Sequence, residues 1–307
     1  LSSAASDVYK KQLFVLHNNI YSGNTRGGEK STSAIIEYLM NYGYEIEALY
    51  PGVADKEDIQ ESIKLHSPDM VLTWGRYTNH VRNACNELDI PLMIFIRTWC
   101  LDRYPFMLHD LSKADSVIIN SIEGQRRLKY LGIESVVSYV PVKHHYPFEK
   151  LGNKILMIGF EKINGLHETL PPLLPDQKFL VVDYNIQEYK KDKNVTYHPY
   201  TDDMNEIWKQ CKIHLFPLPD NGMGTGRTPI EAQMRGIPVI AESGCGAEEL
   251  SYNVLESPDA DDWVSAIKFV DADINYYRHK ALEFIYEHYN REDQLDIIVS
   301  EIQRILN

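Results

Sequence analysis

The chain has 307 residues, of which 44% are hydrophobic and 24% charged, and its formal net charge is -13. At about 150 residues per domain this length predicts two domains, each able to bury its own core. The acidic balance argues against a nucleic-acid partner, because phosphate contacts need a basic surface stripe and the sequence shows none.

The cysteines and the apolar runs indicate the cellular setting. Cys85, Cys100, Cys211 and Cys245 are scattered and form no C-x-x-C pair, which is typical of reduced thiols rather than of disulfides or a zinc site. No apolar run reaches the roughly 18 residues that a membrane-spanning helix needs. We therefore expect a cytoplasmic protein. Its oligomeric state and a peripheral contact with a membrane stay open.

Strand and helix signals alternate along the chain in two series, which is typical of α/β domains with parallel sheets. The first series predicts a helix over 29–42 and strands over 13–16, 46–49, 70–73, 92–96, 116–119 and 136–140. Prolines in 141–153 indicate a linker. The second series predicts strands over 155–158, 179–182, 195–197, 213–216 and 238–241.

This alternation predicts an α/β fold of two Rossmann-like, doubly wound domains, residues 1–145 and 146–307. The last helix is expected to be able to pack back on the first domain. Facing domains of this kind enclose a cleft, and open α/β sheets bind ligands beyond the carboxyl ends of their strands. We therefore expect the functional site in a central cleft.

A glycine-rich loop lies within residues 220–250, DNGMGTGRTPIEAQMRGIPVIAESGCGAEEL. The loop is followed directly by a helix start and a short apolar strand. Gly222, Gly224 and Gly226 predict positive φ angles and a close approach of the backbone to a ligand, because glycine has no Cβ. The loop is therefore the leading candidate for a binding site.

The helix start after this loop has two interpretations. Thr228, Pro229 and Glu231 fit the N-cap, first and third positions of a helix. In one interpretation the free backbone amides and the Arg227 cation bind a phosphate. In the other, Thr228 and Glu231 form a capping box, satisfy each other's amides and bind nothing else.

The segment EAQMRGIPVIAESGCGAEEL resembles the donor-site signature of the retaining GT-B glycosyltransferases of family four, the glycosyl transferases group 1. In the N-terminal half, TRGGEKSTSAIIEYLMNYGYEIEALYP is similar to the family's GGAER helix and the strand after it. HSPDMVLTWG is similar to its KPDVVHAHG, and SKADSVIINSIEGQRRLKYLGI to its ADAVIAVSE segment. The resemblance implies the GT-B fold and retaining transfer from a nucleotide-sugar to an acceptor hydroxyl, without a metal or other cofactor.

The resemblance also implies roles for individual residues. Glu231 matches the family's second signature glutamate, which contacts the ribose, and the pair Gly27 and Gly28 matches glycines that let the first domain approach the donor phosphate. A flexible turn is the alternative for the pair. Together, the resemblance and the loop assign donor binding to Gly27, Gly28, Gly159, Met223, Gly224, Thr225, Gly226, Thr228 and Glu231.

The chain departs from the family pattern at three positions. Met223 stands where the first signature glutamate is expected, which puts recognition of the sugar in doubt. Phe160 stands in place of an arginine, and Asn164 in place of a lysine, that serve the diphosphate. We expect Lys162 and Arg227 to supply these cations, and we assign catalytic roles to both together with Glu231.

Acceptor binding is predicted at side chains that follow the first and fourth strands. Arg97 and Trp99 come after the apolar run LMIFI, where the family commonly has a histidine, and His17 comes after the first strand. An arginine can hold an anionic group and a tryptophan can stack on a sugar. The alternative is a buried tryptophan beside surface arginines.

Two further patterns favour structural roles. His144 and His145 lack ligands at metal-binding spacing, so we interpret them as solvated or packing residues. The two D-x-D triplets, 259–261 and 271–273, precede helical patterns, where aspartate is usually an N-cap. No metal is expected.

The main hypothesis is a retaining, metal-independent glycosyltransferase that joins a nucleotide-sugar donor to a carbohydrate or other hydroxyl acceptor. Charge on the leaving diphosphate would be stabilised by amides and cations. Two alternatives stay open: a sugar-nucleotide epimerase or hydrolase of the same fold, and an inactive protein that binds a nucleotide-sugar.

Overall fold

The computed structural model describes residues 11–15, 27–49, 56–73, 78–97, 107–159, 165–183, 192–201, 203–217, 224–256 and 259–307. The chain divides into two compact units. Unit 1 comprises residues 1–120, 124–141 and 292–307, and unit 2 comprises residues 121–123 and 142–291. The domain boundary expected between residues 145 and 146 stays a prediction.

Unit 1 is built on a six-stranded parallel sheet with the order β2-β1-β3-β4-β5-β6. Its strands are β1 (Lys11–Val15), β2 (Glu45–Leu49), β3 (Met70–Thr73), β4 (Leu92–Ile96), β5 (Ser116–Ile119) and β6 (Val136–Val137). Its helices are α1 (Gly27–Tyr42), α2 (Lys56–His66), α3 (Thr78–Leu88), α4 (Met107–Leu111), α5 (Ile122–Tyr130) and α11 (Arg291–Leu306).

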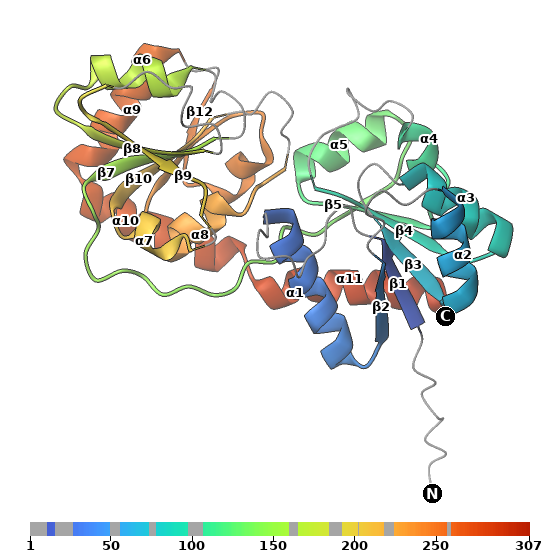
Figure 1. Cartoon of the computed structure of the whole chain (residues 1–307). Coiled ribbons are helices and arrows are strands. Elements are labelled where there is room, and N and C mark those ends of the chain that lie inside the picture. The colour runs from blue at the N-terminus through green and yellow to red at the C-terminus, as the bar shows by residue number, and fades with distance from the viewer. Residues whose placement is uncertain are drawn as a thin grey trace, which may run out of the picture. The chain divides into compact units, whose positions relative to one another are not determined.

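One face of this sheet is covered by α1 and by the C-terminal helix α11 (Figure 1). Alternate residues such as Leu72 and Phe95 contribute to that core with Leu39 of α1 and Ile298 of α11. The strands β3, β4 and β5 are buried at every residue. Helices on both faces explain this burial and the continuous apolar runs by which these strands are recognised in the sequence.

Unit 2 is a second six-stranded parallel sheet, with the order β12-β11-β10-β7-β8-β9. Its strands are β7 (Lys154–Ile158), β8 (Lys178–Asp183), β9 (Val195–Pro199), β10 (Cys211–Phe216), β11 (Val239–Glu242) and β12 (Asn253–Leu255). Its helices are α6 (Leu166–Leu173), α7 (Asn205–Trp208), α8 (Thr228–Met234), η2 (Gly246–Leu250), α9 (Ala260–Ala272) and α10 (Ile274–His288).

The strand order of unit 2 is that of the doubly wound Rossmann fold. From β7 the chain adds β8 and β9 on one side, and then β10, β11 and β12 on the other. The order therefore reverses between β7 and β10, which are hydrogen-bonded neighbours. Ligands in such sheets bind beyond the carboxyl ends of the strands at this reversal, so Gly159 after β7 and the loop after β10 lie at the expected place.

The predicted α/β architecture and all eleven predicted strands are confirmed, with two differences. β6 ends at Val137 instead of residue 140, because the amide of Tyr139 donates to Gln294 Oε1 of α11. β12 is a short edge strand that the sequence did not indicate. The helix predicted over 29–42 begins two residues earlier, so that Gly27 and Gly28, expected to precede it, are the first residues of α1.

Candidate functional site

The centre of the candidate donor site is an ion pair at the start of α8. The guanidinium of Arg227 lies with Nη2 at 3.1 Å and Nε at 3.2 Å from Glu231 Oε1. Both side chains are largely buried, at 14% and 13% exposure. The pairing fixes the two predicted catalytic residues relative to each other.

The predicted capping box is wrong, as is the assignment of Thr228 as the N-cap. The carbonyl of Arg227 already accepts from the Glu231 amide at 2.9 Å, so Arg227 is the cap residue and Thr228 the first helical residue. The Thr228 hydroxyl contacts His214 instead of the helix amides, and the Glu231 carboxylate contacts Arg227. Both side chains that a capping box needs are therefore engaged in other contacts.

The glycine-rich loop shows a positive φ at one of its described glycines. Gly226 has φ +64°, and a Cβ there would lie 3.1 Å from the ring of Phe216, so a larger residue requires that ring to shift by a few tenths of an ångström. Gly224 has no positive φ, contrary to the prediction, and Gly222 lies outside the described residues. Thr225, which lies between Gly224 and Gly226, is fully buried. At the neighbouring strand, the amide of Gly159 donates to Val182 O at 3.0 Å.

A second arginine that the sequence analysis missed supports α8. Arg235 is 4% exposed and donates through Nη1 to the carbonyl of Glu231 at 2.9 Å, and through Nη2 to Asn205 Oδ1 at 3.0 Å. Its guanidinium also lies 5.7 Å from the ring centre of Trp208. Burial lowers the pKa of Arg235. The sequence signal for this contact is the spacing of four residues between Glu231 and Arg235, because residues four apart lie on the same face of a helix.

His145 of the predicted linker lies within the electrostatic reach of this cluster. Burial lowers its pKa to about 4, and the next largest influences are the charges of Arg235, Glu231 and Arg227. Its neighbour His144 packs on the rings of Tyr146 and Tyr286, at 5.0 and 5.6 Å, as the packing interpretation predicted. Sequence spacing gave no signal for His145, because its neighbours come from a helix more than 80 residues further along the chain.

His214 is the third residue that the sequence analysis missed. It lies on β10, is fully buried, and contacts both the backbone of β7 and the Thr228 hydroxyl. A single histidine in an apolar strand carries no sequence signal that separates a structural role from a functional one.

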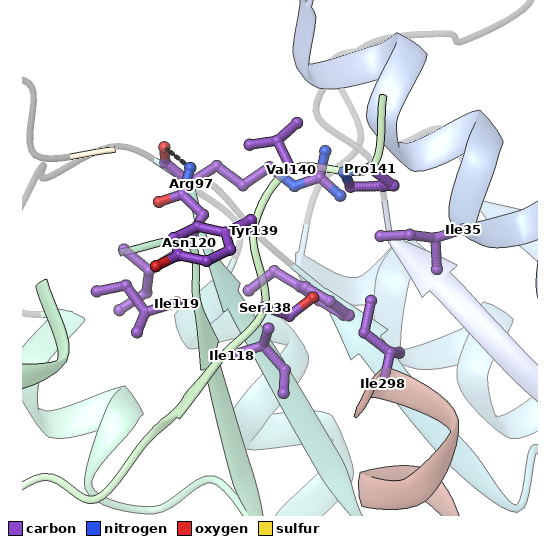
Figure 2. Close-up of a pocket in the computed structure, with 12 residues that line it drawn as sticks. Ile35, Arg97, Ile118, Ile119, Asn120, Ser138, Tyr139, Val140, Pro141 and Ile298 are labelled. Atoms are coloured by element: carbon purple, nitrogen blue, oxygen red, sulfur yellow. Dashed lines mark hydrogen bonds between the residues drawn. The ribbon is translucent and has the colours of Figure 1, made fainter. Parts of the chain in front are cut away.

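In unit 1, a small hollow of about 10 Å³, roughly the room that one water molecule needs, lies at the ends of β4 and β5 (Figure 2). Arg97 and Asn120, the residues that follow these strands, lie at its rim, and Asn120 Nδ2 donates to Arg97 O at 2.8 Å. Arg97 Nη1 donates to the carbonyl of Gly28 at 3.0 Å. Ser138 and Tyr139 also line the hollow, and the rest of its lining is apolar, with Ile35 of α1 and Ile298 of α11 on the side that Figure 2 shows away from the rim.

The structure thus brings Arg97 and Gly28 together in unit 1. Nothing among the described residues lies within 4 Å of the position that a Cβ on Gly28 would take. The remaining predicted site residues lie outside the described residues: His17, Trp99, Lys162 and Met223. Phe160 and Asn164 lie outside them as well.

The aspartates of the D-x-D triplets have structural roles, as predicted. Asp259 accepts from the amides of Asp261 and Asp262, at 2.8 and 3.0 Å, and caps α9. Asp273 caps α10, and Asp271 forms an ion pair with Lys212. Within the described ranges no three histidine, cysteine, aspartate or glutamate side chains gather as metal ligands would.

Comparison with protein families identifies the region that carries this site. Residues 161–273 match the model of the glycosyl transferases group 1. The matched region lies in unit 2 and includes Arg227, Glu231 and His214. No curated protein sequence matches the chain.

Solved structures show the same fold along nearly the whole chain. HepE from Anabaena, solved with UDP-glucose, has a TM-score of 0.75 at 14% identity, over 96% of this chain and 100% of that chain. The lipopolysaccharide outer core galactosyltransferase WaaB has a TM-score of 0.70 at 15% identity, over 96% and 99%. AviGT4, a glycosyltransferase of avilamycin A biosynthesis, has 0.67 at 11%, over 97% and 98%. The chain therefore has the GT-B fold of two Rossmann-like domains.

In the part of the chain that the structure describes, every helix is too short or too polar to cross a bilayer.

Proposed function

We propose that the protein is a retaining glycosyltransferase that moves a sugar from a nucleotide-sugar donor to an acceptor hydroxyl. The observation that carries the proposal is the family match over residues 161–273, which contains the Arg227–Glu231 pair beside the reversal of strand order in unit 2. In this proposal Glu231 binds the donor, and Arg227 with Lys162 supplies the cations for the diphosphate.

The reaction needs a site that stabilises negative charge on the leaving diphosphate. Arg227 is a fixed cation, since Glu231 holds its guanidinium in one orientation and a planar fork can bind phosphate oxygens in pairs. The glycosidic bond to the diphosphate breaks, and the acceptor oxygen bonds to the same face of the sugar. The leaving phosphate takes the acceptor's proton. Stabilisation of the growing charge lowers the barrier without a metal.

We place acceptor binding beside the small hollow of unit 1, at Arg97 on its rim. Its position beyond the ends of β4 and β5 supports this assignment, because parallel α/β sheets bind ligands at that edge. His17 and Trp99 are proposed to contribute to the same acceptor site. The retaining outcome is checked by the anomeric configuration of the product, measured by NMR coupling constants.

Nucleotide binding is the first test. HepE was solved with UDP and with UDP-glucose, so UDP is the first probe, followed by GDP, ADP and dTDP. A ligand that binds only the folded state at 100 times its Kd stabilises the protein by about 2.7 kcal/mol, so one nucleotide is expected to raise the Tm measurably. A wild-type protein whose Tm none of the four changes would contradict the proposal.

The substitution Glu231→Ala is expected to weaken binding of that nucleotide by about 10- to 100-fold, because a charged hydrogen-bond partner is lost. Titration calorimetry measures the change, and a thermal melt checks that the variant is folded. Glu283→Ala is the matched control, since it removes an ion pair of α10, Glu283 with Lys280 at 2.8 Å, that is exposed to solvent. Equal affinities in both variants and wild type would exclude a donor role for Glu231.

Two sequence features favour a second candidate, a donor-binding protein without transfer. Met223 replaces the first signature glutamate and Phe160 replaces a diphosphate arginine. Such a protein binds nucleotide but transfers no sugar to any acceptor offered. An epimerase or hydrolase would instead convert the nucleotide-sugar in the absence of acceptor, so a donor-only incubation separates these activities.

A further inference from the structure

His214 occupies a fully enclosed position in the middle of the unit 2 sheet. Its Nδ1 lies 3.2 Å from the carbonyl oxygen of Leu156 on β7, and its Nε2 lies 3.2 Å from Thr228 Oγ1 on α8. The rings of Trp208 and Phe216 meet the imidazole edge to face, at 5.5 and 6.1 Å. Packing and hydrogen bonds therefore hold the ring in one orientation.

The chemistry of these two contacts decides where the protons are. A carbonyl oxygen only accepts, so Nδ1 carries the hydrogen and donates it to Leu156. In the neutral ring Nε2 is then an acceptor, and the Thr228 hydroxyl donates to it. Burial lowers the pKa of His214 to about 4, which keeps the ring neutral and this arrangement intact near pH 7.

This chain of contacts connects the reversal point of the sheet to the start of α8. Leu156 and His214 face each other on the neighbouring strands β7 and β10. Thr228 is the residue next to Arg227 and lies one helical turn before Glu231. Because threonine is restricted at χ1, fixing its hydroxyl also fixes the backbone that carries Arg227.

We propose that His214 is a positioning residue for the nucleotide-sugar: it orients Thr228 and thereby sets the geometry in which Arg227 and Glu231 bind the donor. The inference rests on the proposed function, since it concerns the same donor site. His214 itself lies behind this site and touches no ligand. Its contribution is transmitted through one hydrogen bond, from the Thr228 hydroxyl.

A double-mutant cycle tests this transmission. Thr228→Val removes the hydroxyl and keeps the shape of the side chain, and His214→Phe removes the ring nitrogens and keeps an aromatic ring. Each is expected to weaken UDP binding about tenfold, and the double variant is expected to be no weaker than either single variant, because both remove the same hydrogen bond. Titration calorimetry with UDP measures the three affinities.

Conservative variants separate positioning from general stability. Thr228→Ser keeps a hydroxyl, and His214→Gln keeps an acceptor oxygen at about the reach of Nε2, so both are expected to bind UDP close to the wild-type level. A structural role alone would lower the Tm of His214→Phe and leave its UDP affinity unchanged. That result, or losses that simply multiply in the double variant, would overturn the proposal.

The outcomes also separate this inference from the proposed function. Should His214→Phe fail to fold, Thr228→Val decides alone, because Thr228 lies at the edge of the core and wild-type UDP affinity in that variant refutes the inference. Wild-type protein that binds none of the four nucleotides overturns the proposed function and this inference with it. Wild-type binding together with unchanged affinities in the variants overturns the inference alone.

Discussion

Two arginine side chains contact one glutamate at α8. Arg227 and Arg235 both contact Glu231, the first through the carboxylate and the second through the carbonyl. His145 beside them is neutral near pH 7, because burial lowers its pKa to about 4. Two guanidinium groups gathered around one carboxylate suit an anionic ligand in a protein whose net charge is -13.

The buried His214 predicts a pH dependence of stability. Its pKa is about 4 in the folded protein and ordinarily about 6.5, so between these values the unfolded chain binds more protons. Its contribution to stability is present above pH 6.5 and is lost as the pH falls toward 4. The slope is at most about 1.4 kcal/mol per pH unit.

Urea unfolding at a series of pH values measures this dependence. His214→Gln lacks the titrating ring, so its free energy of unfolding is expected to change less steeply than that of the wild type from pH 6.5 to 4. Other groups contribute equally to both proteins and cancel in the comparison. Parallel pH profiles for the two proteins would show that folding leaves the pKa of His214 unchanged.

At the level of elements, the described end of the loop before α8 contains a glycine with a positive φ angle that other residues rarely adopt. Gly226 has φ +64° and lies against the ring of the last residue of β10, Phe216. Gly226 therefore packs closely on the strand that the loop follows. Local pattern predicted the glycine, but only the tertiary structure shows its partner ring.

Gly226→Ala is expected to lower the free energy of unfolding of unit 2 by more than the 1–2 kcal/mol that a left-handed alanine costs, about 2–4 kcal/mol in all. Gly244→Ala is the control, because Gly244 has φ +84° and nothing lies within 4 Å of an added Cβ. Denaturant unfolding measures both variants. Equal losses would show that the Phe216 ring moves aside freely.

At the level of the whole molecule, the chain completes its first unit with its last helix. Residues 292–307 belong to unit 1, and Leu295, Ile298, Val299 and Ile302 of α11 are buried in its core. The core of unit 1 is thus completed by a helix that follows the residues of unit 2 in the chain.

Ile298→Ala is therefore expected to destabilise unit 1 by about 2–5 kcal/mol, the usual cost of removing a fully buried isoleucine side chain. Ile305→Ala, on the same helix but only partly buried, is the control and is expected to cost less. Hydrogen exchange followed by mass spectrometry assigns the loss to peptides. Equal loss of protection in unit 1 and unit 2 would contradict a local effect.

The sequence by itself determined the elements and the fold class. Strands such as β4 are apolar at every residue because helices cover both faces of a parallel sheet, so burial is recorded directly in the sequence. The aspartates at 259 and 273 are also recognisable as caps from the sequence, because an N-cap side chain contacts the amides of its own helix.

Only the tertiary structure decided which side chains meet across elements. Thr228 fits a capping box by local pattern, yet its hydroxyl contacts His214 on β10, and Glu231 contacts Arg227. Arg97 meets Gly28, 69 residues earlier in the chain. Residue patterns report whether a position is buried, but a hydrogen-bond partner depends on strand order, which places distant segments side by side.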